Sequence, residues 1–395
     1  MLSKAERLLI AVTALYTLAA TMVSTFANVY LLTYTKSLIT MSIYALVRYG
    51  VLALAAVYAA KLSTKIKFST VLLLGLINII LAVLTLLVVK DYIASHLWLV
   101  YLIGGIWGFG EGFFWITVNT LVQLVTSLNT RMRFIGINGA LSNLVTVIAP
   151  FLSAIILKLR QVEIEGYYLL FLIAIILFFI TAALAIFLNI KASGDKFSIT
   201  NNLTSIKVDK AWRKIVIGQY LLGIRDAATI ALAGLLIYMI VLDGSSYGSW
   251  LGIFAIIATL TQYLSGKIIN QANLLIILIL GSIGIFIGGS FLVLLPTMLG
   301  VILYGIIHNL SAPFCLNSFS IMAMETIGEY LHQENVVGRI ASREILIGAG
   351  RVTGFLIVIL INQFFTFSLQ MEVAFILLYL SSLFFAYTMY RQRNV

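Results

Sequence analysis

The chain alternates between long apolar stretches and short polar connections, and twelve of the stretches are long enough to cross a bilayer. A transmembrane helix needs about 20 mostly apolar residues. The pattern therefore predicts an all-α integral membrane protein with twelve transmembrane helices. The predicted spans are 8–34, 37–60, 68–89, 96–125, 134–158, 167–190, 213–241, 248–269, 272–295, 297–325, 340–363 and 370–390.

One polar, lysine-rich segment separates the first six spans from the last six. We predict an N-terminal six-helix bundle over residues 1–190, a linker over 191–212 and a C-terminal six-helix bundle over 213–395. A 6+6 arrangement of this size is typical of membrane transporters built from repeats.

The two halves show weak internal similarity. The sequence that begins at Tyr58 and ends at Gly75 matches the one from Tyr263 to Gly281. A second match relates the segment at Gly105 to the one at Gly305. Because both matches are separated by roughly 200 residues, they indicate duplication, and the two bundles should be pseudo-symmetric.

Composition agrees with a protein whose outer surface meets lipid. Of the 395 residues, 62% are hydrophobic and 10% are charged, and the mean hydropathy is +1.10. Soluble domains carry about 25% charged residues. Few residues remain for a soluble catalytic domain, and no nucleophile–base set is visible. We therefore expect a protein that is not an enzyme.

Cysteine and histidine usage gives no sign of a metal or cofactor. Cys315 is the single cysteine, so it cannot form an internal disulfide. His96, His308 and His332 are scattered along the chain and form no ligand set. We expect no cofactor and no metal site.

The net charge of +11 is distributed by topology. With the N-terminus inside, the connections assigned to the outside carry only Lys36, Lys90, Lys158 and Arg160 as basic residues. Basic residues favour the cytoplasmic side of a membrane. Both termini should therefore be cytoplasmic in a multi-pass plasma-membrane protein. The basic residues would face lipid headgroups, so we expect no nucleic-acid partner.

Charged residues inside the spans are the main candidates for function, because each costs at least about 2.5–3.5 kcal/mol on insertion. Glu111 lies near the middle of the fourth span, and Trp107, Trp115 and Asn119 recur around it every four residues. An acid between two indoles suits a cationic or protonatable ligand. We expect these four residues to bind substrate and Glu111 to carry the coupled proton. The structural alternative is a pair between Glu111 and an arginine on another helix.

Arg225 and Asp226 are neighbours in the seventh span. Successive helical residues point about 100° apart, so we expect that the two do not neutralise each other directly. A static ion pair with another helix and a gating or substrate role remain equally open for them.

Three further charged residues are assigned to gating or to ion pairs between the bundles. They are Arg48, Glu344 and Arg351. An arginine that points into a central cavity would instead bind an anion. Gly104, Gly108 and Gly112 lie on one face of the fourth span and should let another helix approach closely.

Several stretches carry a family resemblance. They are GFFWITVNTL, NTRMRFIGINGALSN, GIRDAATIALAGLLIY and GRIASREILIGAGRVTG. With the twelve-span pattern, the sequence resembles the twelve-helix type of the major facilitator superfamily, in a poorly characterised prokaryotic branch classed as drug or metabolite exporters. The loop AAKLSTKIKF departs from the family pattern because it lacks the usual glycine and acid. In the fifth span, APFLSA keeps the proline of an exporter element but not its glycines.

The resemblance implies alternating access around a cavity lined by the first, fourth, seventh and tenth helices. The residues it places near the substrate are Asn28, Glu111, Arg225 or Asp226, and His308 or Asn309. Glu111 and Asp226 are then the candidates for proton coupling. Since the cavity would lie within one chain, we expect a monomer.

Two kinds of transport fit these residues. The first is proton-coupled export of small amphipathic or cationic molecules, with the substrate and protons as partners besides the lipid bilayer. The alternative is transport of an organic anion or metabolite by Arg48, Arg225 and Arg351. A membrane sensor that no longer transports is a third reading, from another functional class.

Overall fold

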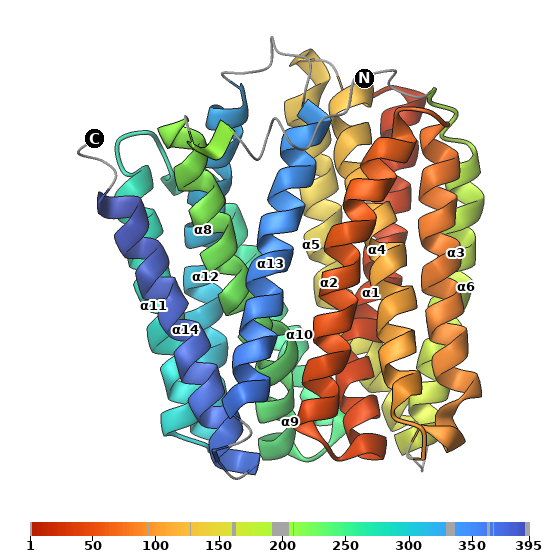
Figure 1. Cartoon of the computed structure of the whole chain (residues 1–395), viewed down its shortest axis with the longest axis vertical. Helices are drawn as coiled ribbons and strands as arrows, with labels where there is room; N and C mark the ends of the chain where they lie inside the picture. The colour runs from red at the N-terminus through yellow and green to blue at the C-terminus, as the bar shows by residue number, and fades with distance from the viewer. Residues whose placement is uncertain are drawn as a thin grey trace.

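The protein is a bundle of long helices in a computed structural model (Figure 1). The structure describes residues 2–93, 95–126, 128–159, 163–191, 205–207, 209–328, 336–361, 364–365 and 367–391. Twelve helices in this part of the chain are long and apolar enough to cross a membrane. The predicted all-α membrane fold with twelve spans is confirmed.

The first half contains six of these helices, and their bounds follow the predicted spans closely. The largest difference is at the fifth helix, which begins six residues before the predicted 134. The helices are α1 (Lys4–Thr35), α2 (Leu38–Ser63), α3 (Phe68–Val88), α4 (Trp98–Val125), α5 (Leu128–Lys158) and α6 (Glu163–Ile186), with a short 3₁₀ turn η1 (Lys90–Tyr92) before α4.

The second half contains the other six spans, and the seventh is built from three pieces. They are α8 (Lys210–Ala227), the π-helical segment η3 (Ala228–Ala233) and α9 (Gly234–Val241). The remaining helices are α10 (Gly244–Ile268), α11 (Leu274–Leu294), α12 (Met298–Gly328), α13 (Val336–Ile361) and α14 (Phe367–Arg391). Most of the predicted linker lies outside the described residues; the described part includes the 3₁₀ turn η2 (Ser205–Lys207).

Both chain termini lie at the same end of the bundle (Figure 1). We call this end, where α1 begins and α14 ends, the terminal face, and the other end the opposite face. The terminal face is the one that the distribution of basic residues assigns to the cytoplasm; this orientation remains a prediction.

The glycine face of α4 brings α4 against the backbone of α2. A Cβ added at Gly104 would lie 2.9 Å from the Tyr44 carbonyl oxygen, and one at Gly108 would meet the Arg48 backbone. A Cβ at Gly112 would lie 2.5 Å from the Leu52 carbonyl oxygen. The predicted close approach of another helix is therefore confirmed, and it holds the Arg48 backbone directly against α4.

Equivalent glycines make equivalent contacts in the two halves. A Cβ at Gly75 on α3 would lie 2.9 Å from the Gly110 carbonyl oxygen and 3.0 Å from the Phe114 nitrogen on α4. A Cβ at Gly281 on α11 would lie 3.0 Å from the Ser311 carbonyl oxygen and 2.8 Å from the Cys315 nitrogen on α12. This correspondence agrees with the duplication that the sequence indicates.

The halves meet most extensively along two pairs of helices, α2 with α13 and α5 with α10. Small residues bring α2 and α13 together, because a Cβ at Gly348 would lie 2.5 Å from the Ala53 Cβ. The α5–α10 contact involves the parts of both helices nearer the opposite face, where Ser245 donates a hydrogen bond of 3.2 Å to the Ala154 carbonyl. There, a Cβ at Gly252 would lie 2.6 Å from the Phe151 ring.

We expect Gly108→Ala to lower the stability of the folded protein, because its methyl group would collide with the α2 backbone at Arg48. Overpacking of this kind costs typically about 1–3 kcal/mol. Gly105→Ala is the matched control, since its Cβ would lie at an ordinary 3.7 Å from the Val47 side chain. Thermal unfolding of the two detergent-purified variants should show a clear loss for Gly108→Ala alone. Equal unfolding temperatures would show that α2 and α4 are not held this tightly.

Candidate functional site

A cavity of about 560 Å³ lies between the two halves. Its walls come from α1, α2, α4, α5, the α8–η3–α9 span, α10 and α12. The first, fourth, seventh and tenth spans of the family pattern thus all contribute. Asn28, Glu111, Trp115, His308 and Asn309 line this central cavity.

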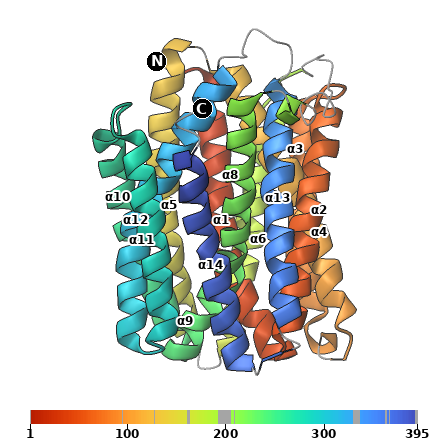
Figure 2. The same ribbon diagram turned by 60° about the vertical axis from the view of Figure 1, so that its left-hand side comes forward.

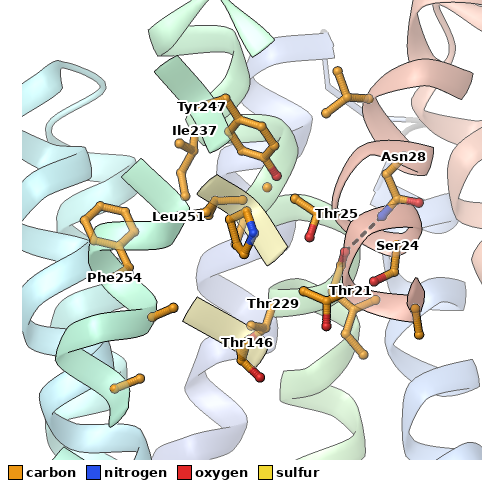
Figure 3. A pocket seen from close by; sticks show the side chains of 18 of the residues that line it. Thr21, Ser24, Thr25, Asn28, Thr146, Thr229, Ile237, Tyr247, Leu251 and Phe254 are labelled. Carbon is orange, nitrogen blue, oxygen red and sulfur yellow. Dashed lines mark hydrogen bonds between the residues drawn. The ribbon is translucent and has the colours of Figure 1, made fainter. Parts of the chain in front are cut away.

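One wall of the cavity is a polar face of α1. Thr17, Thr21, Ser24, Thr25 and Asn28 recur every three or four residues and line it together. Figure 3 shows four of these residues pointing towards side chains of the second half, among them Thr229 and Tyr247. Sequence reasoning singled out Asn28 and missed the hydroxyls, although their helical spacing is visible in the sequence.

Arg48 and Glu111 form a bidentate ion pair in the cavity wall. Arg48 Nε donates to Glu111 Oε2 at 2.9 Å, and Nη2 donates to Oε1 at 2.7 Å. The side chains belong to α2 and α4, and the residues are 5% and 8% exposed. The alternative of a pair with an arginine on another helix is therefore realised, and the pair also borders the cavity.

The other residues of the predicted α4 stripe occupy different environments. Trp107 is 1% exposed and lies outside the cavity lining, with the Arg48 guanidinium 4.3 Å from its ring centroid. The cation over this indole is thus part of the protein itself. Trp115 lines the cavity and meets Tyr16 edge-on at 5.4 Å. Asn119 is half-buried outside the lining.

Asp226 lies between two arginines in the second half. Arg225 Nη2 donates to Asp226 Oδ1 at 2.5 Å, and Arg351 Nη2, from α13, donates to Oδ2 at 2.9 Å. The expectation that Arg225 and Asp226 do not neutralise each other is wrong. Although their Cα–Cβ bonds diverge, the long arginine side chain bends back to its neighbour. None of the three residues lines the central cavity.

Tyr49 connects these two charged groups across the interface between the halves. Its ring centroid lies 5.4 Å from the Arg48 guanidinium and 5.0 Å from that of Arg351. The same ring stacks on Phe355 of α13 at 5.8 Å. The half-buried Glu344 makes no ion pair within the part of the chain that the structure describes.

A cluster of hydroxyl and imidazole groups adjoins the cavity in the second half. Tyr379 Oη lies 3.1 Å from Thr229 Oγ1, 3.5 Å from Tyr304 Oη and 3.4 Å from His308 Nδ1. His308 also stacks on Tyr304, with centroids 5.0 Å apart. Tyr304 and Tyr379 were not anticipated from the sequence, because tyrosines are frequent in apolar spans and nothing marks these two.

Asn28 links the halves next to the cavity. Its Nδ2 donates a hydrogen bond of 3.1 Å to the Ile230 carbonyl in η3, shown as the dashed line in Figure 3. Phe26 lies two residues before Asn28 on α1. Its ring meets the Tyr247 ring of α10 edge-on, with the centroids 5.8 Å apart. Together with the α5–α10 contact, these interactions join the two halves on the side of the cavity nearer the opposite face.

The chain is similar in sequence to a known family and to two bacterial proteins. A profile described as the Major Facilitator Superfamily matches residues 9–334. The chain is 25% identical over 355 residues to the uncharacterized protein YqgE of Bacillus subtilis, covering 89% of this chain and 81% of that protein. An uncharacterized protein of Geobacillus stearothermophilus is 29% identical over 165 residues, which cover 42% of this chain and 75% of that protein.

Solved transporter structures share the fold. A variant of the nucleoside transporter NupG superposes with a TM-score of 0.73 at 14% identity, covering 98% of this chain and 99% of that one. A bacterial homologue of the iron transporter ferroportin, in an inward-facing state, also gives 0.73, at 15% identity and 99% coverage of both chains. At these identities the likeness concerns the fold alone.

We expect Arg48→Met to destabilise the protein strongly, because it leaves the buried Glu111 carboxylate without its partner. Breaking a buried pair costs about 3–5 kcal/mol. Arg48→Met combined with Glu111→Gln should recover much of this loss, since no unpaired charge remains. The measurement is the thermal unfolding of all variants in detergent. A double variant no more stable than Arg48→Met would show that the pair is not the source of the effect.

Proposed function

Because the chain belongs to the Major Facilitator Superfamily, we propose that it is a secondary active transporter that works by alternating access. It exports small amphipathic or cationic molecules in exchange for protons. The observation that carries this proposal is the Arg48–Glu111 pair, a carboxylate–guanidinium ion pair at the wall of a cavity between two helical halves.

Three cations can compete for the Glu111 carboxylate: a proton, the Arg48 guanidinium and a cationic substrate. Protonation of Glu111 removes the attraction for both of the others. A cationic group in the cavity would instead displace Arg48 from Glu111, and the guanidinium would keep its contact with the face of Trp107. Binding of substrate and binding of the proton are then mutually exclusive, which is the requirement for exchange.

The rest of the lining suits a small amphipathic molecule. Threonine, serine and asparagine side chains of α1 offer hydrogen bonds on one wall. Trp115, Phe254 and Tyr247 supply aromatic surface from α4 and α10. A volume of about 560 Å³ lies within the usual range for small-molecule sites, about 300–1,000 Å³.

Transport of an organic anion is the alternative, and Arg48 favours it because this arginine lines the cavity. An anion would compete with Glu111 for the guanidinium. Arg225 and Arg351 add less support, since both are paired with Asp226 and lie outside the lining.

Proton movement in liposomes containing the purified protein tests the proposal. We expect lipophilic organic cations to cause a proton flux that Glu111→Gln abolishes. Glu165→Gln, which changes an exposed acid near the start of α6, is the control and should leave the flux unchanged. The Arg48→Met and Glu111→Gln double variant separates loss of the proton site from loss of the fold.

The outcomes decide between the two kinds of substrate. Unchanged cation-driven flux in Glu111→Gln and Asp226→Asn, singly and combined, would overturn the proposed coupling. A flux with organic acids alone, kept in Glu111→Gln and lost in the Arg48→Met and Glu111→Gln double variant, would assign the cavity to anions.

A further inference from the structure

A second hollow, of about 1,080 Å³, lies beside α5, α10 and α12. Its lining runs from Gly139 to Val147 on α5 and from Ile256 to Lys267 on α10. Because α5 begins and α10 ends at the terminal face, this lateral groove occupies the half of the bundle near that face. Near the opposite face α5 and α10 are in contact, so the groove is the place where the two helices separate. Figure 2 shows α10 at one edge of the bundle, with α5 further in.

The lateral groove and the central cavity are neighbours along α5 and α10. On α5, Thr146 lines the cavity and the next residue, Val147, lines the groove. On α10, Ala258 lines the cavity and Thr259 lines the groove. The groove therefore begins on the same helical turns at which the cavity ends.

The walls of the groove are unlike its floor. Leu144, Ile256 and Leu260 are exposed apolar side chains on helices that span the membrane, so this part of the groove borders lipid hydrocarbon. Deeper lies an amide network, in which Gln262 Nε2 donates to Asn317 Oδ1 at 3.0 Å and Asn317 Nδ2 donates to Ser265 Oγ at 2.6 Å. An apolar wall beside hydrogen-bonding groups matches the two ends of an amphiphile.

Charge favours one direction of movement along this path. Lys267 lies at the end of the groove nearest the terminal face, with its Nζ 4.4 Å from the Tyr263 ring centroid. Among the described residues that line the groove and the cavity, the acid is Glu111, in the cavity. A cationic head group is repelled at the Lys267 end and attracted at the Glu111 end.

We propose that the lateral groove binds the hydrocarbon chain of a single-chain amphiphile with a cationic head, which reaches the central cavity from the bilayer between α5 and α10. The proposal rests on the proposed function, and it names the substrate class and its route. The amphiphile lies with its chain against Leu144 and Leu260 and its head towards Glu111.

Site-directed thiol labelling tests binding in the groove without measuring transport. Cys315→Ser removes the single native thiol, which is buried. A cysteine introduced as Gly139→Cys or Gly266→Cys points into open space, because a Cβ at either glycine has no neighbour within 4 Å. Ile176→Cys on α6 is the matched lipid-facing control. Ile176 is 58% exposed and does not line the groove.

The rate of reaction with a lipophilic maleimide is measured in liposomes, with dodecyltrimethylammonium or tetramethylammonium as the probe. We expect dodecyltrimethylammonium to slow labelling several-fold at both groove positions and not at Ile176→Cys. Tetramethylammonium, which has no chain, should protect none of them. Equal protection at all three positions, or at none, would overturn the proposal. Labelling that slows as the protein-to-lipid ratio rises, without any amphiphile, would assign the groove to a second copy of the chain and also overturn it.

A transport measurement then separates the route from the coupling. Gly139→Phe places a ring in the groove, and we expect it to reduce the proton flux driven by dodecyltrimethylammonium while a short aromatic cation still drives its usual flux. If Gly139→Phe and wild type showed the same flux with dodecyltrimethylammonium, as well as with the short cation, the route would be contradicted. A Glu111→Gln variant that keeps the cation-driven proton flux, while dodecyltrimethylammonium still protects the groove cysteines, would contradict the coupling proposal. That result would leave the groove proposal standing.

Discussion

A charge placed in a bilayer has to be satisfied by the protein, and the Arg48–Glu111 pair is where this constraint shapes the first half. The two donors of Arg48 reach both carboxylate oxygens because α2 and α4 run in backbone contact. Glycines at Gly104, Gly108 and Gly112 make that contact possible. Trp107 then covers the guanidinium on its remaining face. Packing, charge and the cavity wall thus depend on the same short stretch of two helices.

The second half satisfies its charges differently. Asp226 pairs with two arginines at once, and this triad lies outside the cavity lining, where α8 meets α13. Tyr49 is the aromatic ring that both charged groups share, since Arg48 and Arg351 approach it from opposite halves. A displacement of α13 relative to α2 would change the surroundings of both groups. The interface between the halves is therefore also an electrostatic connection.

Sequence reasoning recovered what depends on spacing along one helix. The twelve spans, the glycine face of α4 and the set of intramembrane charges all follow from hydropathy and helical periodicity. The arginine that pairs with Glu111 could not be predicted in this way. Arg48, Arg225 and Arg351 were all possible partners, and a single sequence does not say which helix lies beside which. The Arg225–Asp226 contact was excluded wrongly, because an argument from Cα–Cβ directions ignores the reach of a long side chain. The hydroxyls of α1 were visible in the pattern but were overlooked in favour of charge.

The π-helical segment η3 has a mechanical consequence for the seventh span. A π-helix accommodates an extra residue in the turn of an otherwise α-helical element. Conversion of this turn to α-helical geometry would rotate everything after it by about 100° relative to everything before it. The part of the span nearer the terminal face, α8, could then keep Asp226 paired with Arg351 of α13 while α9 turned Leu235 and Ile237 away from the cavity. The hydrogen bonds that hold η3, from Asn28 to the Ile230 carbonyl and between Thr229 and Tyr379, would resist this rotation. The seventh span would then move as two helical segments that turn about η3.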